Sequence, residues 1–210
     1  MNLIDLFPKT IAAANLETLT PELIRRAIEY IDAAEKTGLV ESDGVYTTNQ
    51  QLLEHDLFRE VKQEIVSLCK RYSECLCHVV EGIRICNSWG NVIEHGQSIR
   101  LHRHNNSYIS GSFYLTGGSS FVISNLGFHD IFGFVPRVSK SNYRSWESFA
   151  INPEPGGIVL FPSGLYHSVA PSTSKEKRYS IAFNAVPLGT IGRPTSLLDL
   201  GTLPRASTDA

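Results

Sequence analysis

The sequence is poor in several features that would identify a class of protein. Its 210 residues include only four cysteines and one methionine, and 19 basic against 21 acidic side chains give a net charge of -2. No two cysteines have Cys-x-x-Cys spacing, so neither disulfides nor a cysteine zinc site is expected. The balanced charge lacks the basic surplus that binds a phosphate backbone, so nucleic acid is not an expected partner.

Long hydrophobic runs are also missing. The first residues have neither the basic start nor the apolar run of about 7–15 residues that a secretory signal needs, and no later run approaches a membrane span. We therefore expect a cytoplasmic protein that does not bind membranes. With 42% hydrophobic residues the chain can bury one substantial core, which predicts a single domain over residues 1–210.

Two helices are expected in residues 1–76. Thr20 and Pro21 are a capping residue and a first-turn proline, and the apolar spacing after them predicts a helix that ends near Gly38. A second helix is predicted over residues 56–72, because the apolar side chains there fall on one face. Both helices should pack on one flank of a sheet.

Residues 77–187 have a different sequence pattern. Short runs of residues that favour β-strands are separated by Gly, Asn, Ser and Pro, which is typical of a sandwich or barrel. The expected strands cover residues 79–92, 107–115, 120–124, 157–161, 167–170 and 179–186. The long aromatic stretch 126–146 is either a lid or a segment that covers a sheet edge. Residues 188–210 are expected to form a C-terminal tail. The predicted fold class is therefore mainly β with flanking helices.

Three of the seven histidines lie where β-structure could bring them together. His102 and His104 come just before one expected strand, and side chains two apart on an extended segment project to the same side. His167 starts another strand and could reach the same point from across a barrel. Imidazole is a ready ligand for Fe(II), so these are candidate metal ligands, although a His-x-His pair alone is more often structural.

Arg178 and Ser180 lie two apart on a strand-like segment and should face the same side. A guanidinium there offers a planar two-donor grip for a carboxylate, and the serine hydroxyl adds a donor. The alternative is a surface arginine paired with an acidic side chain. The order of the features along the chain favours the carboxylate site. Paired histidines come first, followed by a strand, a Gly-rich turn, a Pro-Gly turn, a lone histidine and then the arginine.

This order resembles the 2-oxoglutarate and Fe(II)-dependent oxygenase superfamily, and it is closest to an oxygenase family of bacteria and phages. Five segments carry the resemblance: residues 88–92, 101–107, 110–115, 160–169 and 178–184. The resemblance implies a double-stranded β-helix, a cupin-like jelly roll with the N-terminal helices on one flank. It also implies Fe(II), 2-oxoglutarate as co-substrate, and oxidative decarboxylation to succinate coupled to oxidation, by hydroxylation, of a second molecule.

The resemblance also assigns metal ligands, with one departure. In the superfamily the first histidine of the pair and the distal histidine bind the metal, which here are His102 and His167. The position two residues after the first is normally Asp or Glu, and here it is His104. An all-histidine site can still bind Fe(II) but lacks one negative charge.

Several arrangements could complete the metal shell. His104 could be the third ligand, or a nearby carboxylate such as Glu94 or Asp130 could take that place. In a further arrangement His104 is the first ligand and Asn106 lies near the metal. The sequence leaves these alternatives open.

The co-substrate residues follow from the same resemblance. Arg178 and Ser180 match the Arg-x-Ser element that binds the distal carboxylate of 2-oxoglutarate. Tyr114 occupies a strand position whose hydroxyl donates to that carboxylate in related hydroxylases, and its alternative is a half-buried strand tyrosine. Asn91 and Asn184 lie on neighbouring expected strands and could place amides near the metal or co-substrate, although such asparagines often satisfy backbone groups at strand ends.

The expected partners are a small-molecule or peptide substrate and molecular oxygen; the sequence does not indicate an oligomeric state. Two alternative functions belong to other classes. One is a cupin-like metal enzyme that does not use 2-oxoglutarate, and the other is a non-catalytic β-sandwich binding module whose histidines are incidental. Metal binding separates the module from both enzymes, and dependence on 2-oxoglutarate separates the two enzymes.

Overall fold

The computed structural model describes residues 1–2, 5, 8–38, 40, 42–126, 137–140 and 142–201. A larger sheet contains β1 Ala12–Asn15, β2 Lys36–Thr37, β3 Val45–Thr47, β4 Gly82–Ile93, β6 Ile109–Tyr114, β9 Gly157–Pro162 and β11 Arg178–Leu188. A smaller sheet contains β5 Ile99–His102, β7 Phe121–Ser124, β8 Ser148–Ile151 and β10 His167–Val169. The predicted mainly β class is confirmed.

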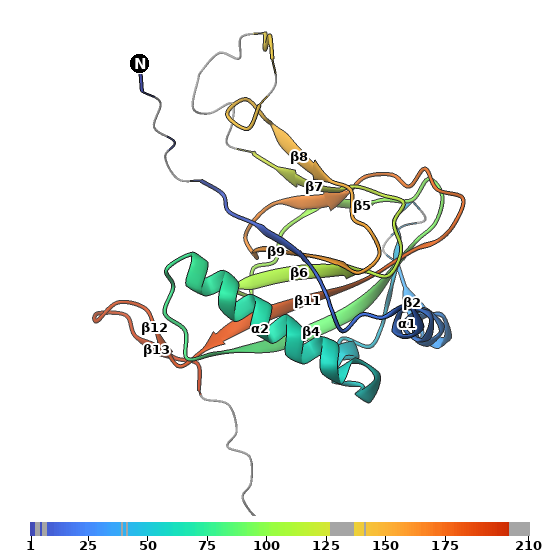
Figure 1. The fold of residues 1–210 in the computed structure, drawn as a ribbon, viewed down its shortest axis with the longest axis horizontal. Coiled ribbons are helices and arrows are strands. Elements are labelled where there is room, and N and C mark those ends of the chain that lie inside the picture. Colours follow the sequence, from blue (N-terminus) through green and yellow to red (C-terminus); the bar gives the residue numbers. More distant parts are fainter. Residues whose placement is uncertain are drawn as a thin grey trace, which may run out of the picture.

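The two sheets lie face to face, with the smaller one above the larger one in Figure 1. The order in the larger sheet is β1-β9-β6-β11-β4-β3-β2, and in the smaller sheet it is β5-β10-β7-β8. Every pair of neighbouring strands in these sheets is antiparallel. A separate hairpin follows β11, formed by β12 Thr190–Ile191 and β13 Leu198–Asp199.

The first helix, α1 Pro21–Ala33, begins as predicted: the Thr20 hydroxyl accepts a hydrogen bond from the Leu23 amide at 3.2 Å. Its predicted end at Gly38 is wrong. The Lys36 ammonium donates to three main-chain carbonyls at the end of the helix, which satisfies groups that a further turn would otherwise bond. The chain then forms β2, paired with β3.

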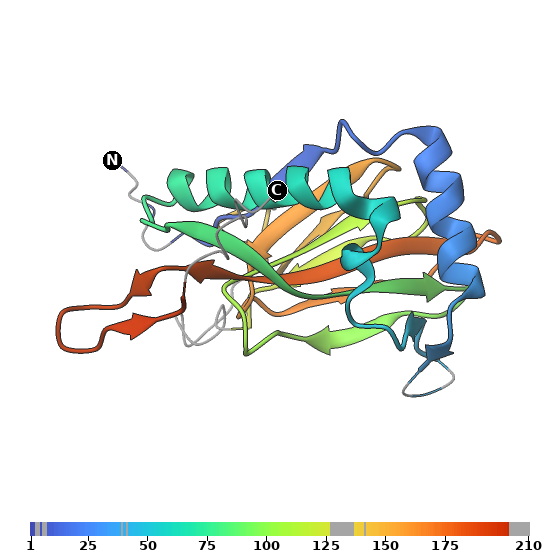
Figure 2. The ribbon, with the colours of Figure 1, turned by 90° about the horizontal axis from the view of Figure 1, so that it is seen from below.

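The second helix is α2 Arg59–Cys75, preceded by two short 3₁₀ turns, η1 Leu52–Glu54 and η2 Asp56–Phe58. Both helices cover one face of the larger sheet, as predicted (Figure 2). Gly90 of β4 permits the close approach of α1, because a Cβ there would lie 2.9 Å from the Ile31 side chain. The main core fills the space between helices and sheet.

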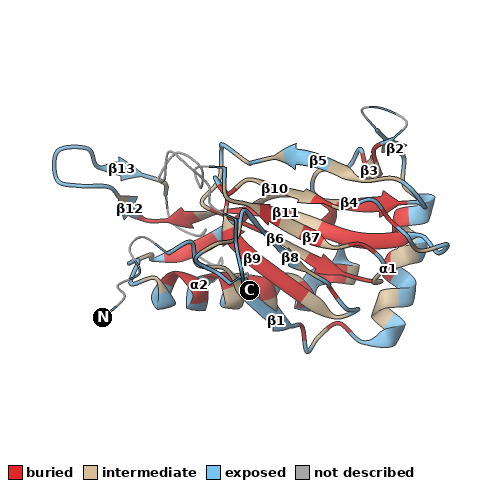
Figure 3. Ribbon diagram, turned by 90° about the horizontal axis from the view of Figure 1, so that it is seen from above, coloured by how far each residue is buried: buried red, intermediate tan, exposed pale blue. Residues whose placement is uncertain are grey.

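The central strands of the larger sheet are buried on both faces (Figure 3). Neighbouring residues alternate between two cores: Phe113 of β6 packs toward the helices, whereas Tyr114 packs toward the smaller sheet. In β9, Leu160 and Phe161 divide in the same way. The second core, between the sheets, surrounds the cavity described below.

Some elements were not predicted. The part of the chain before residue 77 was expected to be helical, yet β1, β2 and β3 lie there and join the larger sheet. These strands are short, and their partners are distant in sequence, so no local alternation marks them. Strand β8, the hairpin after β11 and strand β5 were also missed. Strand β5 carries His102, so that histidine ends a strand instead of preceding one.

The aromatic stretch 126–146 is only partly described. Phe128, Phe132 and Phe134 lie outside the described residues, so the choice between lid and sheet-edge cover stays a prediction. Trp146 stacks on Phe149 of β8, with ring centroids 4.9 Å apart. No helix among the described residues is both long and apolar enough to span a bilayer.

Candidate metal and co-substrate site

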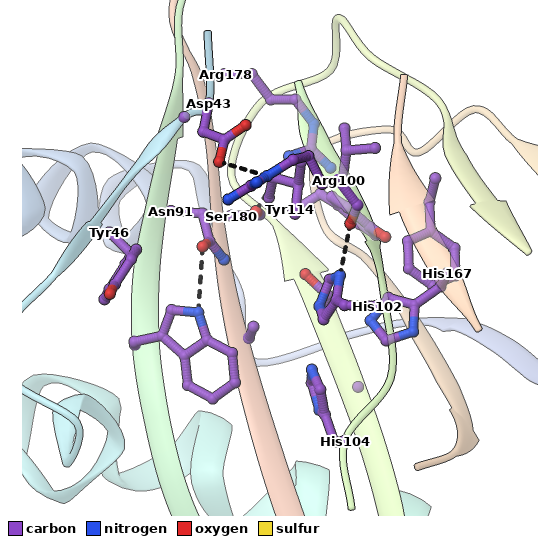
Figure 4. Close-up of a pocket in the computed structure, with 18 of the residues that line it drawn as sticks. Asp43, Tyr46, Asn91, Arg100, His102, His104, Tyr114, His167, Arg178 and Ser180 are labelled. Carbon is purple, nitrogen blue, oxygen red and sulfur yellow. Dashed lines mark hydrogen bonds and ion pairs between the residues drawn. The ribbon is translucent and has the colours of Figure 1, made fainter. Parts of the chain in front are cut away.

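A cavity of about 510 Å³ opens between the two sheets (Figure 4). Its volume lies within the roughly 300–1,000 Å³ of sites that bind small molecules. The larger sheet lines it with side chains that alternate along its strands and therefore share one face. These are Trp89 and Asn91 of β4, Ser112 and Tyr114 of β6, and Arg178, Ser180 and Ala182 of β11.

The smaller sheet brings the three predicted histidines to this cavity. His102 and His167 are directly paired across β5 and β10, with ring centroids 4.2 Å apart. His104 follows in a loop whose position is held by a hydrogen bond from its main-chain amide to the Ser163 carbonyl, 2.9 Å long. One ring nitrogen from each histidine lies within 4.8 Å of the other two. The arrangement can hold one metal ion.

Main-chain carbonyls define the tautomers of two of these rings. Nδ1 of His102 lies 2.8 Å from the Arg100 carbonyl, and Nδ1 of His167 lies 2.8 Å from the Leu165 carbonyl. A carbonyl can only accept, so each Nδ1 carries the proton and each Nε2 keeps its lone pair. This is the tautomer that a metal-binding histidine needs, with its second nitrogen held by the protein.

The third ring is held by side chains. Nδ1 of His104 contacts the Asn184 amide oxygen and also lies 2.9 Å from the Ser110 hydroxyl. The Ser110 hydroxyl is in turn 2.6 Å from the same Asn184 oxygen and 2.8 Å from the Ser163 hydroxyl. The amide oxygen accepts, so His104 also donates through Nδ1 and keeps the Nε2 lone pair. The sequence had not indicated Ser110 or Ser163, because their role depends on contacts between distant strands.

Burial keeps two of the rings neutral. It lowers the pKa of His167 to about 3 and also lowers the pKa of His104, because removal from water disfavours the charged imidazolium. A neutral imidazole is the form that binds a metal. The donor set therefore fits a divalent ion without first having to lose protons.

Arg178 lies at the other end of the cavity and is only 1% exposed. Its Nη1 is 3.3 Å from the Ser180 hydroxyl, and its Nε has no hydrogen-bond partner. No acidic side chain among the described residues pairs with it, so the surface ion pair considered as an alternative is not what the structure has. A buried cation without a counterion is costly, which makes this end of the cavity a fitting place for an anion.

Tyr114 completes this end of the cavity. It is fully buried, not half-buried, and its ring centroid lies 5.1 Å from Cζ of Arg178. Its hydroxyl forms no hydrogen bond with any described residue. Burial raises the pKa of Tyr114 to about 12, so the hydroxyl keeps its proton and can donate.

The two asparagines lie on the paired strands β4 and β11, as predicted, but in different surroundings. Asn91 lines the cavity opposite Ser180, and its amide oxygen accepts from the Trp89 indole at 3.1 Å. That contact leaves the Asn91 NH₂ group as a donor. Asn184 lies behind His104 instead, where its amide oxygen accepts from the His104 ring and the Ser110 hydroxyl. It does not line the cavity, so this position does not support a direct contact with the co-substrate.

Of the two carboxylates considered as replacement ligands, Glu94 does not join the histidines. Glu94 follows the end of β4, is exposed, and pairs with Lys177 at 3.1 Å. Among the described residues, the group that could hold a metal consists of the three histidines alone. Asp130 lies outside the described residues. Asn106 is exposed and does not line the cavity. The structure therefore does not support the arrangement in which His104 is the first ligand and Asn106 lies near the metal.

Residues 87–184, which contain the histidine cluster and the buried arginine, match a family model described as "Putative 2OG-Fe(II) oxygenase". This part of the chain belongs to the 2OG-Fe(II) oxygenase family. The chain is therefore a 2-oxoglutarate-dependent enzyme, with Fe(II) as metal and 2-oxoglutarate as co-substrate. The binding-module alternative is wrong, and so is the cupin-like enzyme without 2-oxoglutarate. No curated protein matches the sequence.

Solved structures of 2-oxoglutarate enzymes share the fold. The carbocyclase SnoK from nogalamycin biosynthesis is 14% identical, with a TM-score of 0.64, 86% of this chain covered and 81% of that one. HygX from Streptomyces hygroscopicus, solved with nickel and 2-oxoglutarate, is 11% identical, with a TM-score of 0.59 and coverages of 85% and 83%. A Pseudomonas putida prolyl-4-hydroxylase is 15% identical, with a TM-score of 0.56 and coverages of 86% and 94%. The predicted double-stranded β-helix is confirmed.

Proposed function

We propose that this oxygenase is a hydroxylase that acts on a small molecule or peptide while it converts 2-oxoglutarate to succinate. In this proposal the three clustered histidines bind Fe(II), and Arg178 binds the C5 carboxylate of 2-oxoglutarate. The observation that carries the proposal is the presence, in one cavity, of three free Nε2 lone pairs and a buried guanidinium that has no acidic partner among the described residues. A dicarboxylate that chelates a metal at one end needs both features.

The anchor for the C5 carboxylate consists of three donors. Arg178 supplies a planar guanidinium, and Ser180 supplies a hydroxyl that already lies beside it. Tyr114 supplies a protonated hydroxyl that has no hydrogen-bond partner among the described residues. The carboxylate would give the buried cation the counterion that it lacks. These groups lie on rigid, buried strands, so the co-substrate would be oriented without rearrangement of the chain.

The metal end depends on ring orientation. His102 and His167 are held by main-chain carbonyls, and His104 is held by Asn184, so all three imidazoles offer Nε2 from one side. When bound, Fe(II) supplies the oxygen-dependent oxidation chemistry in which 2-oxoglutarate loses carbon dioxide and the substrate gains an oxygen atom. The chain itself needs no general base for this reaction.

Apolar side chains around His167 shield the proposed metal site from water. The rings of Phe121 and Phe161 lie 5.4 and 4.6 Å from the His167 ring, and Phe161 is nearly inaccessible to water. They keep bulk water away from one side of the metal site, which protects reactive species from side reactions.

The test is an anaerobic titration of the purified protein with Fe(II) and 2-oxoglutarate. The visible charge-transfer band of the chelate should appear only when both are present, at one iron per chain, and admission of oxygen should then yield succinate. Zinc in place of iron should occupy the histidines and give no band. A protein that binds one iron but shows neither the band nor succinate with 2-oxoglutarate would contradict the proposal.

A further inference from the structure

A charged pair lies at the rim of the cavity, between the edges of the two sheets. Arg100 is on β5 of the smaller sheet, and Asp43 comes just before β3 of the larger sheet. The Arg100 Nε donates to Oδ2 of Asp43 at 3.0 Å, and Figure 4 shows the arginine side chain reaching from β5 toward Asp43 and Asn91. The main chain is joined at the same place, because the Gly44 amide donates to the Ser98 carbonyl at 2.9 Å.

The two partners of this pair differ in accessibility. The Asp43 side chain is only 9% exposed, whereas the Arg100 side chain is 60% exposed and lines the cavity. Only Nε of Arg100 is bonded to Asp43, and neither Nη1 nor Nη2 forms a hydrogen bond with any described residue. Asp43 therefore positions the arginine through one edge of the guanidinium and leaves the other donors free.

The charges around the cavity are not balanced. Among the described residues that line the cavity, Asp43 is the single acidic one, against the two arginines Arg100 and Arg178. Histidines that donate through Nδ1 and bind a metal through Nε2 are neutral, and the dianion 2-oxoglutarate cancels a divalent metal. One positive charge remains, because this site has His104 where a carboxylate would have supplied a negative one.

We infer that the primary substrate carries a carboxylate, and that the free Nη edge of Arg100 binds it. This inference rests on the proposed function and deepens it. A guanidinium held through Nε can still offer its two Nη groups to a planar oxyanion, and the bound anion would neutralise the remaining charge. Arg100 precedes His102 by two residues on an extended strand, so their Cα atoms are about 7 Å apart. The Nη groups lie near Asp43 and Asn91 (Figure 4), so the carboxylate would bind at the rim of the same cavity that holds the three histidines.

The experiment compares matched acids and amides as probes: phenylacetate with phenylacetamide, hexanoate with hexanamide, and N-acetylglycine with its amide. The protein is loaded with Zn(II) and saturating 2-oxoglutarate, so no turnover occurs. Binding is followed by the indole N–H resonance of Trp89, which lines the cavity. The chain has two tryptophans, and Trp146→Phe assigns the signal.

Each acid should bind at least about tenfold more tightly than its amide, because a charge-assisted hydrogen bond is lost in the amide. The preference should vanish in Arg100→Gln and be reduced in Arg100→Lys, which keeps the charge without the planar fork. Arg84→Gln, an exposed site at the far end of β4, makes the same change in net charge and should leave the preference intact. The double variant Asp43→Asn with Arg100→Gln avoids an unpaired buried carboxylate and should behave like Arg100→Gln.

Three results would overturn the inference: equal binding of acids and amides, failure of every acid to bind at millimolar concentration, or an acid preference that persists in Arg100→Gln. Binding of 2-oxoglutarate is measured separately on each protein. If the parent protein does not bind 2-oxoglutarate, the proposed function fails instead. If all variants bind it equally but the acid preference is unchanged, only the assignment of Arg100 fails.

Discussion

The two sheets of this molecule contribute to the site in different ways. The smaller sheet has short strands: β5, which carries His102, has no fully buried residue, whereas β10 carries the buried His167. The larger sheet brings Arg178 and Tyr114 on strands that are buried almost throughout. Hydrogen bonds to ring nitrogens therefore orient the three rings at the proposed metal end, whereas burial in the larger sheet mainly fixes the side chains at the proposed co-substrate end.

This difference shows that two half-sites in one cavity can depend on different forces. A change at the histidines should alter metal binding without loss of the anchor, and a change at the anchor should leave the metal in place. Variants that fail to separate the two effects would show that the sheets act as one unit. The predictions below are ordered from the largest expected effect to the smallest.

The largest effect is expected from loss of a histidine. His102→Ala or His167→Ala removes one of three protein ligands and should abolish stoichiometric Fe(II) binding, while the circular dichroism spectrum stays that of the parent. His104→Ala should do the same, because His104 is the third proposed ligand. His104→Asp supplies the carboxylate that is usual in the superfamily and should retain iron. Full iron content in all three alanine variants, measured by metal analysis, would refute the metal site.

Changes at Arg178 should affect the other half-site. Arg178→Ala should weaken 2-oxoglutarate binding by about ten- to a hundredfold, since a charge-assisted bond to a desolvated carboxylate contributes about 1.5–3 kcal/mol. The 2-oxoglutarate affinity of Arg178→Lys should lie between that of the parent and that of Arg178→Ala, because lysine keeps the charge but lacks the planar guanidinium. The chelate absorbance against 2-oxoglutarate concentration measures this, and iron affinity should be unchanged.

Arg178→Met gives the matched stability control. Because the guanidinium is buried without a counterion, an apolar side chain of similar length should leave the melting temperature of the ligand-free protein unchanged or raise it. The same variant should lose the stabilisation that 2-oxoglutarate gives the parent. A large drop in the melting temperature without ligand would indicate that Arg178 has a structural role.

A smaller effect is expected at Asn184, which positions His104 without touching the metal. Asn184→Ala removes the acceptor for Nδ1 and should lower iron affinity by about tenfold. Asn184→Asp keeps an acceptor at the same place and should retain the affinity, whereas Asn184→Leu keeps similar bulk without an acceptor and should bind iron as weakly as Asn184→Ala. The measurement is iron competition with a chelator. Equal affinity in the parent and Asn184→Ala would show that His104 does not need Asn184 for its orientation.

The smallest effect is expected at Tyr114. Tyr114→Phe removes one hydroxyl donor and keeps the ring beside Arg178, so 2-oxoglutarate affinity should fall by about three- to tenfold. Iron binding and the fold should be unaffected, because the ring contacts of the second core persist. An unchanged dissociation constant for 2-oxoglutarate would mean that the hydroxyl has another partner in the loaded enzyme.

The elements found from the sequence were those whose signal is local. Helix α1 has a capping threonine and proline, and β4, β6, β9 and β11 are marked by apolar runs between turn residues. Strands β1 and β3 have three or four residues and gain their partners from far along the chain, so no local pattern marks them. The end of α1 was missed because the Lys36 side chain, not a glycine, satisfies its last carbonyls.

The candidate site divides in the same way. The sequence by itself determined which residue types are present and that His102 and His104, or Arg178 and Ser180, share a face, because two-residue spacing on an extended chain is a local property. Only the tertiary structure decided that His167 pairs with His102, that Asn184 lies behind His104 rather than in the cavity beside Arg178, and that no acidic side chain of the described residues pairs with Arg178. Strand register and burial arise from contacts between segments far apart in the chain, and no local spacing encodes them.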